Sequence, residues 1–111
     1  MLQDRPPRTS AYPIACDLAA IAPESRPRHR VLLRRLREAM CERGELPDGY
    51  AFRLNGALVS LVEVAEWAAL ERACCPFLTF EIEAPAGETD WWIRLRGAAG
   101  VKEFLECEFA S

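Results

Sequence analysis

The sequence contains no apolar run that approaches the ~20 residues needed to cross a bilayer. The segment from Met1 to Arg8 has no apolar centre of the kind that defines a secretory signal. Internal repeats and low-complexity stretches are also missing. We therefore expect a cytoplasmic globular protein without a membrane partner. A chain of 111 residues has room for one hydrophobic core, so one domain is expected.

Several signatures of metal and nucleotide sites are missing as well. The 5 cysteines form no C-x-x-C pair, which excludes a structural zinc ribbon. Residues 97–100 match neither the P-loop nor the dinucleotide fingerprint. An odd number of cysteines cannot all pair within one chain, and in a reducing cytosol they are expected to be free thiols.

The chain has an ordinary globular composition, with 50% hydrophobic and 28% charged residues. Arginine is in excess in residues 1–43 and acidic residues are in excess in residues 44–111, so the two parts can attract each other within one chain or across a dimer. An arginine-rich helix could also meet nucleic acid phosphates. The net charge of −3 and the pI of about 5.2 argue against a nucleic acid partner.

The first part of the chain predicts an arm and a helix. Residues 1–13 are rich in proline and arginine and are expected to form a flexible arm ahead of a domain over residues 14–111. Residues 14–18 form a short strand or an extended segment. Residues 23–43 are predicted to be a helix that ends at Gly44. Its apolar side carries His29, Leu32, Leu33, Leu36, Ala39 and Met40.

The second part alternates between strands and helices. A strand over residues 50–54 is followed by a helix over residues 58–74, which Pro76 ends. The strands over residues 77–84 and 91–96 form a hairpin, and residues 101–109 form a last helix. The helix over residues 58–74 is expected to be covered on both sides, by the sheet and by the first helix or a second subunit. Its apolar stripe is Leu58, Leu61, Val62, Ala65, Ala68 and Ala69. Its second face carries Glu63, Trp67, Leu70, Glu71 and Cys74.

This order of elements predicts an α+β domain with two layers. A small mixed or antiparallel sheet of three to four strands is expected, with three helices packed on it.

The adjacent cysteines Cys74 and Cys75 lie where a helix meets a strand, and they are the leading candidate site. Thiolate sulfur is a soft donor that suits Cu(I), Hg(II) or As(III). Two sulfurs leave most coordination geometries incomplete, so we predict Cys16 as a third ligand. Cys41 and Cys107 are expected to fill helix faces. The alternative for Cys74 and Cys75 is simple packing at the corner, because free cysteine is often buried.

Other residues have weaker claims to a function. The single histidine, His29, lies on an apolar stripe, where a core or capping role is the usual one, and a general base or ligand is the alternative. Glu63, Glu66 and Glu71 are expected to be solvated or paired helix residues.

Three blocks of the chain resemble a family of small bacterial proteins of uncharacterised activity that carry an E-R-x-C-C-P-F segment. The blocks are Glu71-Arg72-Ala73-Cys74-Cys75-Pro76-Phe77-Leu78, residues 92–97 and residues 100–105. Residues 49–54 look like a further block, and the resemblance covers about residues 14–109. The resemblance implies a bacterial source. It implies no activity for this chain, because the family has no established one.

The leading hypothesis is a protein that binds a thiophilic metal or metalloid ion, or changes its thiol redox state, through Cys74, Cys75 and Cys16. A second hypothesis is a non-enzymatic, dimeric interaction module that uses Trp67, Leu70, Trp92 and the basic helix as a contact surface. A third is a Cys/His enzyme, which needs His29 beside a cysteine. The expected partners are a second copy of the chain and a further protein.

Overall fold

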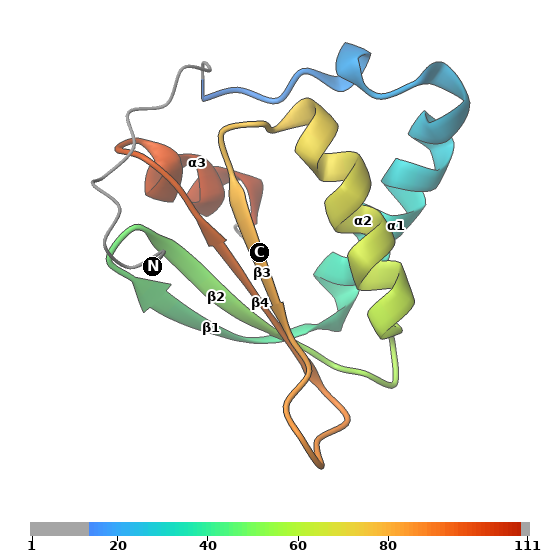
Figure 1. The fold of residues 1–111 in the computed structure, drawn as a ribbon, viewed down its shortest axis with the longest axis vertical. Coiled ribbons are helices and arrows are strands. Elements are labelled where there is room, and N and C mark those ends of the chain that lie inside the picture. Colours follow the sequence, from blue (N-terminus) through green and yellow to red (C-terminus); the bar gives the residue numbers. More distant parts are fainter. Residues whose placement is uncertain (1–13, 110–111) are drawn as a thin grey trace.

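Four antiparallel strands form one sheet, and three α-helices cover one of its faces (Figure 1). The computed structural model describes residues 14–109. The strand order is β1-β2-β4-β3. The elements are α1 (Arg26–Ala39), β1 (Met40–Leu46), β2 (Gly49–Leu54), α2 (Leu61–Cys74), β3 (Thr79–Glu83), β4 (Trp91–Arg96) and α3 (Val101–Glu108), with short 3-10 turns at Leu18–Ala20 and Pro23–Ser25. The predicted α+β class is confirmed.

The sheet face that meets the helices is apolar. In the register of the two central strands, Tyr50 lies opposite Leu95 and Phe52 lies opposite Ile93. The Trp67 ring of α2 packs edge-on against Phe80 of β3 and against Phe109. One continuous core therefore joins all three helices to the sheet.

The opposite face of the sheet carries ion pairs. Arg94 binds Glu83 at 2.7 Å and Arg96 binds Glu81 at 3.0 Å, which joins β4 to β3 diagonally. Because these side chains are partly exposed, each pair contributes at most about 1 kcal/mol. The hairpin that the sequence predicts from these two strands is confirmed.

The arginines of α1 pair with acids from the second part of the chain. Arg28 makes two hydrogen bonds of 2.9 Å with Glu66, and Arg35 lies 3.0 Å from Glu63. Both acids belong to α2, so the pairs link the two helices that lie side by side in Figure 1. The predicted attraction between the basic and acidic parts occurs within one chain.

The predicted helix over residues 23–43 is too long at its C-terminal end. It ends at Ala39, and Met40 begins β1, which pairs with β2. Residues 40–43 continue the helical pattern, but the backbone hydrogen bonds to β2 prevail over this local preference. Cys41 is therefore a strand residue rather than the helix-face filler that the sequence predicts.

The expected cover on both faces of α2 is found on one face only, because the apolar stripe is exposed except at Ala68. Leu58 precedes the helix, which Ser60 caps with its side chain, and Leu61 and Val62 are exposed. The second face is the buried one: its members Trp67, Glu71 and Cys74 lie in the interior, together with Val64 and Ala68. Both faces carry apolar residues, and the larger Trp67 determines which one packs on the sheet.

The segment of residues 14–18 is a bend that leads into the first 3-10 turn and belongs to no strand. The arm predicted for residues 1–13 lies outside the described residues. None of the helices in the described part of the chain has the length and apolar composition needed to span a bilayer.

Candidate metal centre

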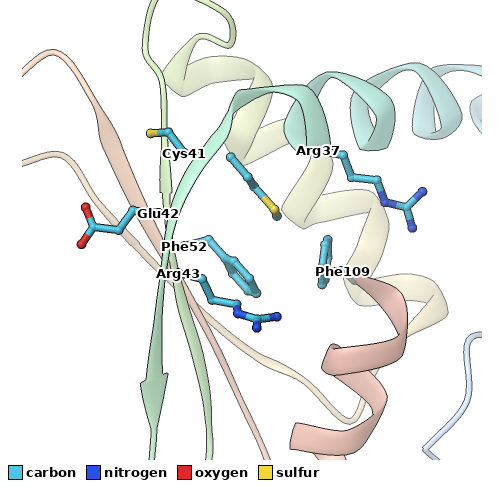
Figure 2. Close-up of a pocket in the computed structure, with 7 residues that line it drawn as sticks. Arg37, Cys41, Glu42, Arg43, Phe52 and Phe109 are labelled. Carbon is cyan, nitrogen blue, oxygen red and sulfur yellow. The ribbon is translucent and has the colours of Figure 1, made fainter. Parts of the chain in front are cut away.

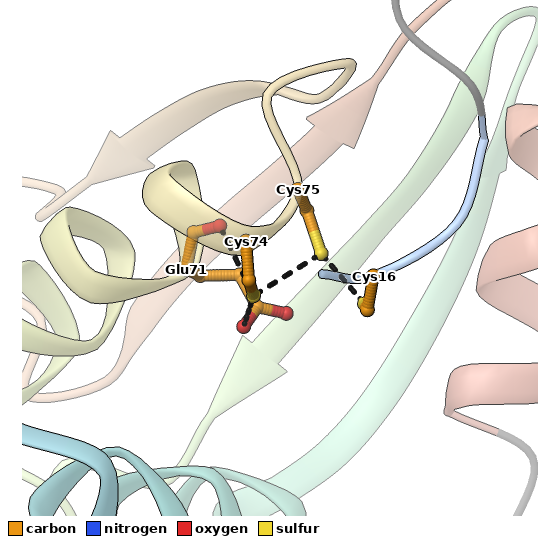
Figure 3. A group of neighbouring side chains, drawn as sticks. All are labelled: Cys16, Glu71, Cys74 and Cys75. Carbon is orange, nitrogen blue, oxygen red and sulfur yellow. Dashed lines mark hydrogen bonds between the residues drawn. The ribbon is translucent and has the colours of Figure 1, made fainter. Parts of the chain in front are cut away.

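Three sulfur atoms and one carboxylate converge at the end of α2 (Figure 3). The Cys75 Sγ lies 2.7 Å from the Cys16 Sγ and 3.5 Å from the Cys74 Sγ. With a carboxylate oxygen of Glu71, these ligand atoms all lie within 4.8 Å of one another. The structure thus brings together the three cysteines predicted from the sequence and adds Glu71 to them.

The end of α2 explains how two adjacent thiols reach one point. Cys74 is the last helical residue, and Cys75 caps the helix with φ −128° and ψ 64°, outside the helical region. Pro76 disfavours helical backbone at Cys75, so the chain turns there. The Cys75 N–H donates to the Glu71 carbonyl at 2.7 Å, which holds the corner against the last turn of the helix.

Cys16 arrives from a segment far away in the sequence. The Asp17 N–H donates to the Cys74 carbonyl at 2.9 Å, so the residue after Cys16 is fixed to the end of α2. The Asp17 side chain accepts from the Ala19 N–H at 3.2 Å and caps the first 3-10 turn. These two bonds place the Cys16 thiol over the corner.

Glu71 connects the thiols to the only histidine. Its Oε1 lies 2.6 Å from His29 Nε2 on α1 and 3.3 Å from the Cys74 Sγ. Glu71 is 2% exposed and His29 is 4% exposed. Buried carboxylates need a partner, and His29 supplies it. Of the two roles expected for Glu71, solvated or paired, the structure shows the second, with a buried partner.

The pKa values of the three clustered thiols are shifted in different directions. Hydrogen bonds from Cys74 and from Cys75 lower the pKa of Cys16 to about 3. The hydrogen bond with Cys16 raises the pKa of Cys74 and also that of Cys75, and burial raises both further. The cluster therefore favours one thiolate, on Cys16, beside two protonated thiols.

The negative charges of the cluster affect the pKa of Glu108 on α3. Burial raises the pKa of Glu108 above its usual value, and the charges of Cys16 and Glu71 raise it further. Glu108 therefore lies within the field of the cluster. Its carboxylate also lies 3.4 Å from Arg37 Nη2 on α1.

Exposure differs between the ligands. Cys74 and Cys75 are fully buried, whereas Cys16 is exposed. Cys16 is therefore the clustered cysteine that is most accessible to solvent.

A separate pocket of about 370 Å³ lies between α1, β1 and the end of α3 (Figure 2). Phe52 and Phe109 form part of its wall, and the Arg37 and Arg43 side chains extend beside them. None of the three clustered cysteines lines this pocket. The cysteine cluster and this pocket are therefore in different places.

The remaining candidates lie outside the cluster. Cys41 and Cys107 are exposed and belong to no group of metal-ligand atoms among the described residues. Trp67 is fully buried, so it cannot belong to the contact surface that the interaction-module hypothesis requires. Within residues 14–109, His29 forms a hydrogen bond with Glu71 and none with a cysteine. The direct Cys/His pair that the enzyme hypothesis requires is therefore not found among these residues.

Glu71 is the site residue that the sequence analysis missed. The available signal was its position three residues before Cys74, since residues three apart share one helix face.

Comparison of the chain with protein-family models, curated proteins and solved structures finds no match. The family resemblance carried by residues 71–78 stays a prediction.

Proposed function

We propose that this protein binds a thiophilic metal or metalloid ion through Cys16, Cys74 and Cys75. The observation that carries the proposal is the convergence of three sulfurs from two distant segments of the chain. Simple packing does not require this convergence, because buried cysteines pack well without thiol neighbours.

The spacing of the Cys74 and Cys75 sulfurs is close to that of a thiolate site. Around a tetrahedral ion with metal–sulfur bonds of about 2.3 Å, sulfurs lie about 3.8 Å apart. The Cys74 and Cys75 sulfurs are 3.5 Å apart, and all the ligand atoms fall within 4.8 Å. The Cys16 and Cys75 sulfurs, at 2.7 Å, would have to move apart to take up this spacing. Small rotations of the side chains would bring the three sulfurs around one ion, and soft ions are the ones that thiolates select.

The test is a titration with Cd(II) and with As(III), followed by native mass spectrometry. We expect one ion per chain in the wild type and none in Cys74→Ser/Cys75→Ser or in Cys16→Ser at the same concentrations. Cys41→Ser/Cys107→Ser is the matched control, because it removes two thiols outside the cluster and leaves the three ligands. Equal stoichiometry and affinity in all variants would refute the proposal.

A thiol redox change is a second candidate, favoured by the contact between Cys16 and Cys75. With hydrogen peroxide as oxidant, the Cys16 thiolate would attack one oxygen and give a sulfenic acid and hydroxide. The Cys75 thiol would then displace water and form a disulfide. Two thiols lose two electrons, and peroxide is reduced to two waters. A mass loss of about two hydrogens mapped to peptides with Cys16 and Cys75 would identify the bond.

We propose a reducing cytosol as the compartment, because the ion site requires free thiols. The homodimer and the protein partner expected from the sequence stay predictions. Sedimentation across a range of protein concentrations tests the homodimer directly.

A further inference from the structure

We propose that Glu71 is a fourth ligand that favours ions of tetrahedral preference, and that His29 is the positioning residue that holds it. This inference rests on the proposed thiol site and explains which ions that site would prefer. The arrangement that carries it is the Glu71 carboxylate, which contacts both a ligand thiol and a buried histidine.

Glu71 lies inside the ligand group by distance. One of its carboxylate oxygens is within 4.8 Å of all three sulfurs. Its Oε1 accepts the hydrogen bonds from His29 and Cys74, and within residues 14–109 Oε2 accepts none. The carboxylate thus has one oxygen fixed by the protein and lone pairs left on the other.

Stability gives little reason for a buried carboxylate at this position. Burying a charged pair removes two groups from water, and an apolar pair of similar volume is often as stable or more stable. Both Glu71 and His29 are buried, and both lie among core residues of α1 and α2. A ligand role accounts for this pair where packing alone does not.

A fourth ligand should favour ions that bind four donors over ions that bind three. Zn(II) and Cd(II) prefer four ligands in tetrahedral geometry, so three sulfurs and one oxygen complete their shell. As(III) forms three bonds in a pyramid and keeps a lone pair, so three sulfurs satisfy it. Loss of the Glu71 oxygen should therefore weaken binding of Cd(II) and leave binding of As(III) nearly unchanged.

His29 acts on the ion through Glu71. Residues that hydrogen-bond a ligand fix its orientation, and their loss typically costs 10–100-fold in metal affinity. The His29 Nε2–H donates to Oε1 at 2.6 Å from the neighbouring helix, which limits the rotation of the carboxylate. A side chain without this donor would release Glu71 from the site.

The experiment measures Cd(II) and As(III) affinities by competition with a chelator and with a dithiol. Four proteins are compared: wild type, Glu71→Gln, His29→Leu and His29→Gln. We expect Glu71→Gln and His29→Leu to weaken Cd(II) binding by about 10–100-fold and As(III) binding by less than about threefold. His29→Gln keeps an N–H donor and should recover most of the Cd(II) affinity. The cadmium-113 NMR shift should move when the oxygen ligand is lost.

Controls separate this inference from the proposed function and from misfolding. Glu66→Gln alters an acid of the same helix that pairs with Arg28 outside the cluster, and it should bind both ions like the wild type. Circular dichroism of each variant confirms folding, and Glu71→Gln tests the ligand role if His29→Leu fails to fold. Wild-type Cd(II) affinity and an unchanged NMR shift in Glu71→Gln would overturn the inference while the thiol site stands. Absence of binding of either ion to the wild type would overturn both.

Discussion

The backbone N–H of Asp17 donates to the carbonyl of Cys74 at 2.9 Å, and this bond fixes an N-terminal segment to the end of α2. It places the Cys16 Sγ 2.7 Å from the Cys75 Sγ, although the two residues are 59 positions apart in the sequence. The candidate site therefore depends on a tertiary contact that involves no side chain.

Substitution of Asp17 by proline should release Cys16 without removing a ligand. Proline has no N–H, and its φ near −65° differs from the −115° of Asp17, so the segment cannot keep its place. We expect Asp17→Pro to lower Cd(II) affinity as much as Cys16→Ser does in the same competition assay. Asp17→Ala keeps the N–H and serves as the control. If Asp17→Pro binds like Asp17→Ala, the backbone bond does not position the ligand.

Ion binding should release protons from the two buried thiols. Cys16 has a pKa lowered to about 3 and is already a thiolate at neutral pH, whereas the pKa values of Cys74 and Cys75 are raised. A bound Cd(II) ion requires three thiolates, so about two protons leave on binding and affinity rises about 100-fold per pH unit near neutrality. Calorimetry in two buffers of different ionisation enthalpy counts the protons. A proton count of zero would contradict the assignment of the buried thiols as ligands.

Much of the fold was predictable because strong local patterns agree with the tertiary structure. The alternation of Trp91, Ile93 and Leu95 identified β4, and Pro76 correctly marked the end of α2. Strand β1 was not predictable, since residues 40–43 continue a helical pattern and only pairing with β2 makes them a strand.

The three cysteines of the site could be predicted from the sequence, but the buried Glu71 could not. The cysteine pair marked the corner, and Cys16 was chosen because a third donor was needed. Glu71 was not recognised as a site residue because it was expected to be a solvated or paired helix residue, and the sequence does not show that its partner is the buried His29. With apolar residues on both faces of α2, burial follows from the packing of Trp67, which periodicity alone does not reveal.

Truncation of Trp67 should test the buried face of α2. Its side chain is fully buried between Phe80 and Phe109, so Trp67→Ala leaves a large cavity. We expect a loss of about 3–5 kcal/mol in the free energy of unfolding, measured with urea. Val62→Ala is the control on the predicted stripe, because Val62 is 75% exposed and its truncation should cost less than about 0.5 kcal/mol. Equal losses for both variants would argue against the observed packing.

Removal of one partner of the buried pair should cost more than removal of both. His29→Leu leaves the Glu71 carboxylate buried without its donor, for which a loss of about 3–5 kcal/mol is typical. His29→Leu/Glu71→Leu removes the uncompensated group and should recover most of that stability. Urea unfolding of the two single variants and the double variant gives the coupling free energy. Strictly additive losses would mean that the two side chains do not interact.

Thiol labelling should distinguish the exposed ligand from the buried ones. Cys16, Cys41 and Cys107 are exposed, whereas Cys74 and Cys75 are buried. We expect iodoacetamide to alkylate the exposed cysteines rapidly in the folded protein and the buried ones only after unfolding. Peptide mass spectrometry assigns each label to a residue.

Bound Cd(II) should then protect Cys16 selectively. A metal-bound thiolate is a poor nucleophile and its access is blocked, so the labelling rate of Cys16 should fall at least about tenfold. Cys41 and Cys107 lie outside the ligand group and should keep their rates, which makes them internal controls within the same sample. If Cys16 reacts equally fast with and without Cd(II), it is no ligand, and an ion would be held by the buried Cys74 and Cys75 without it.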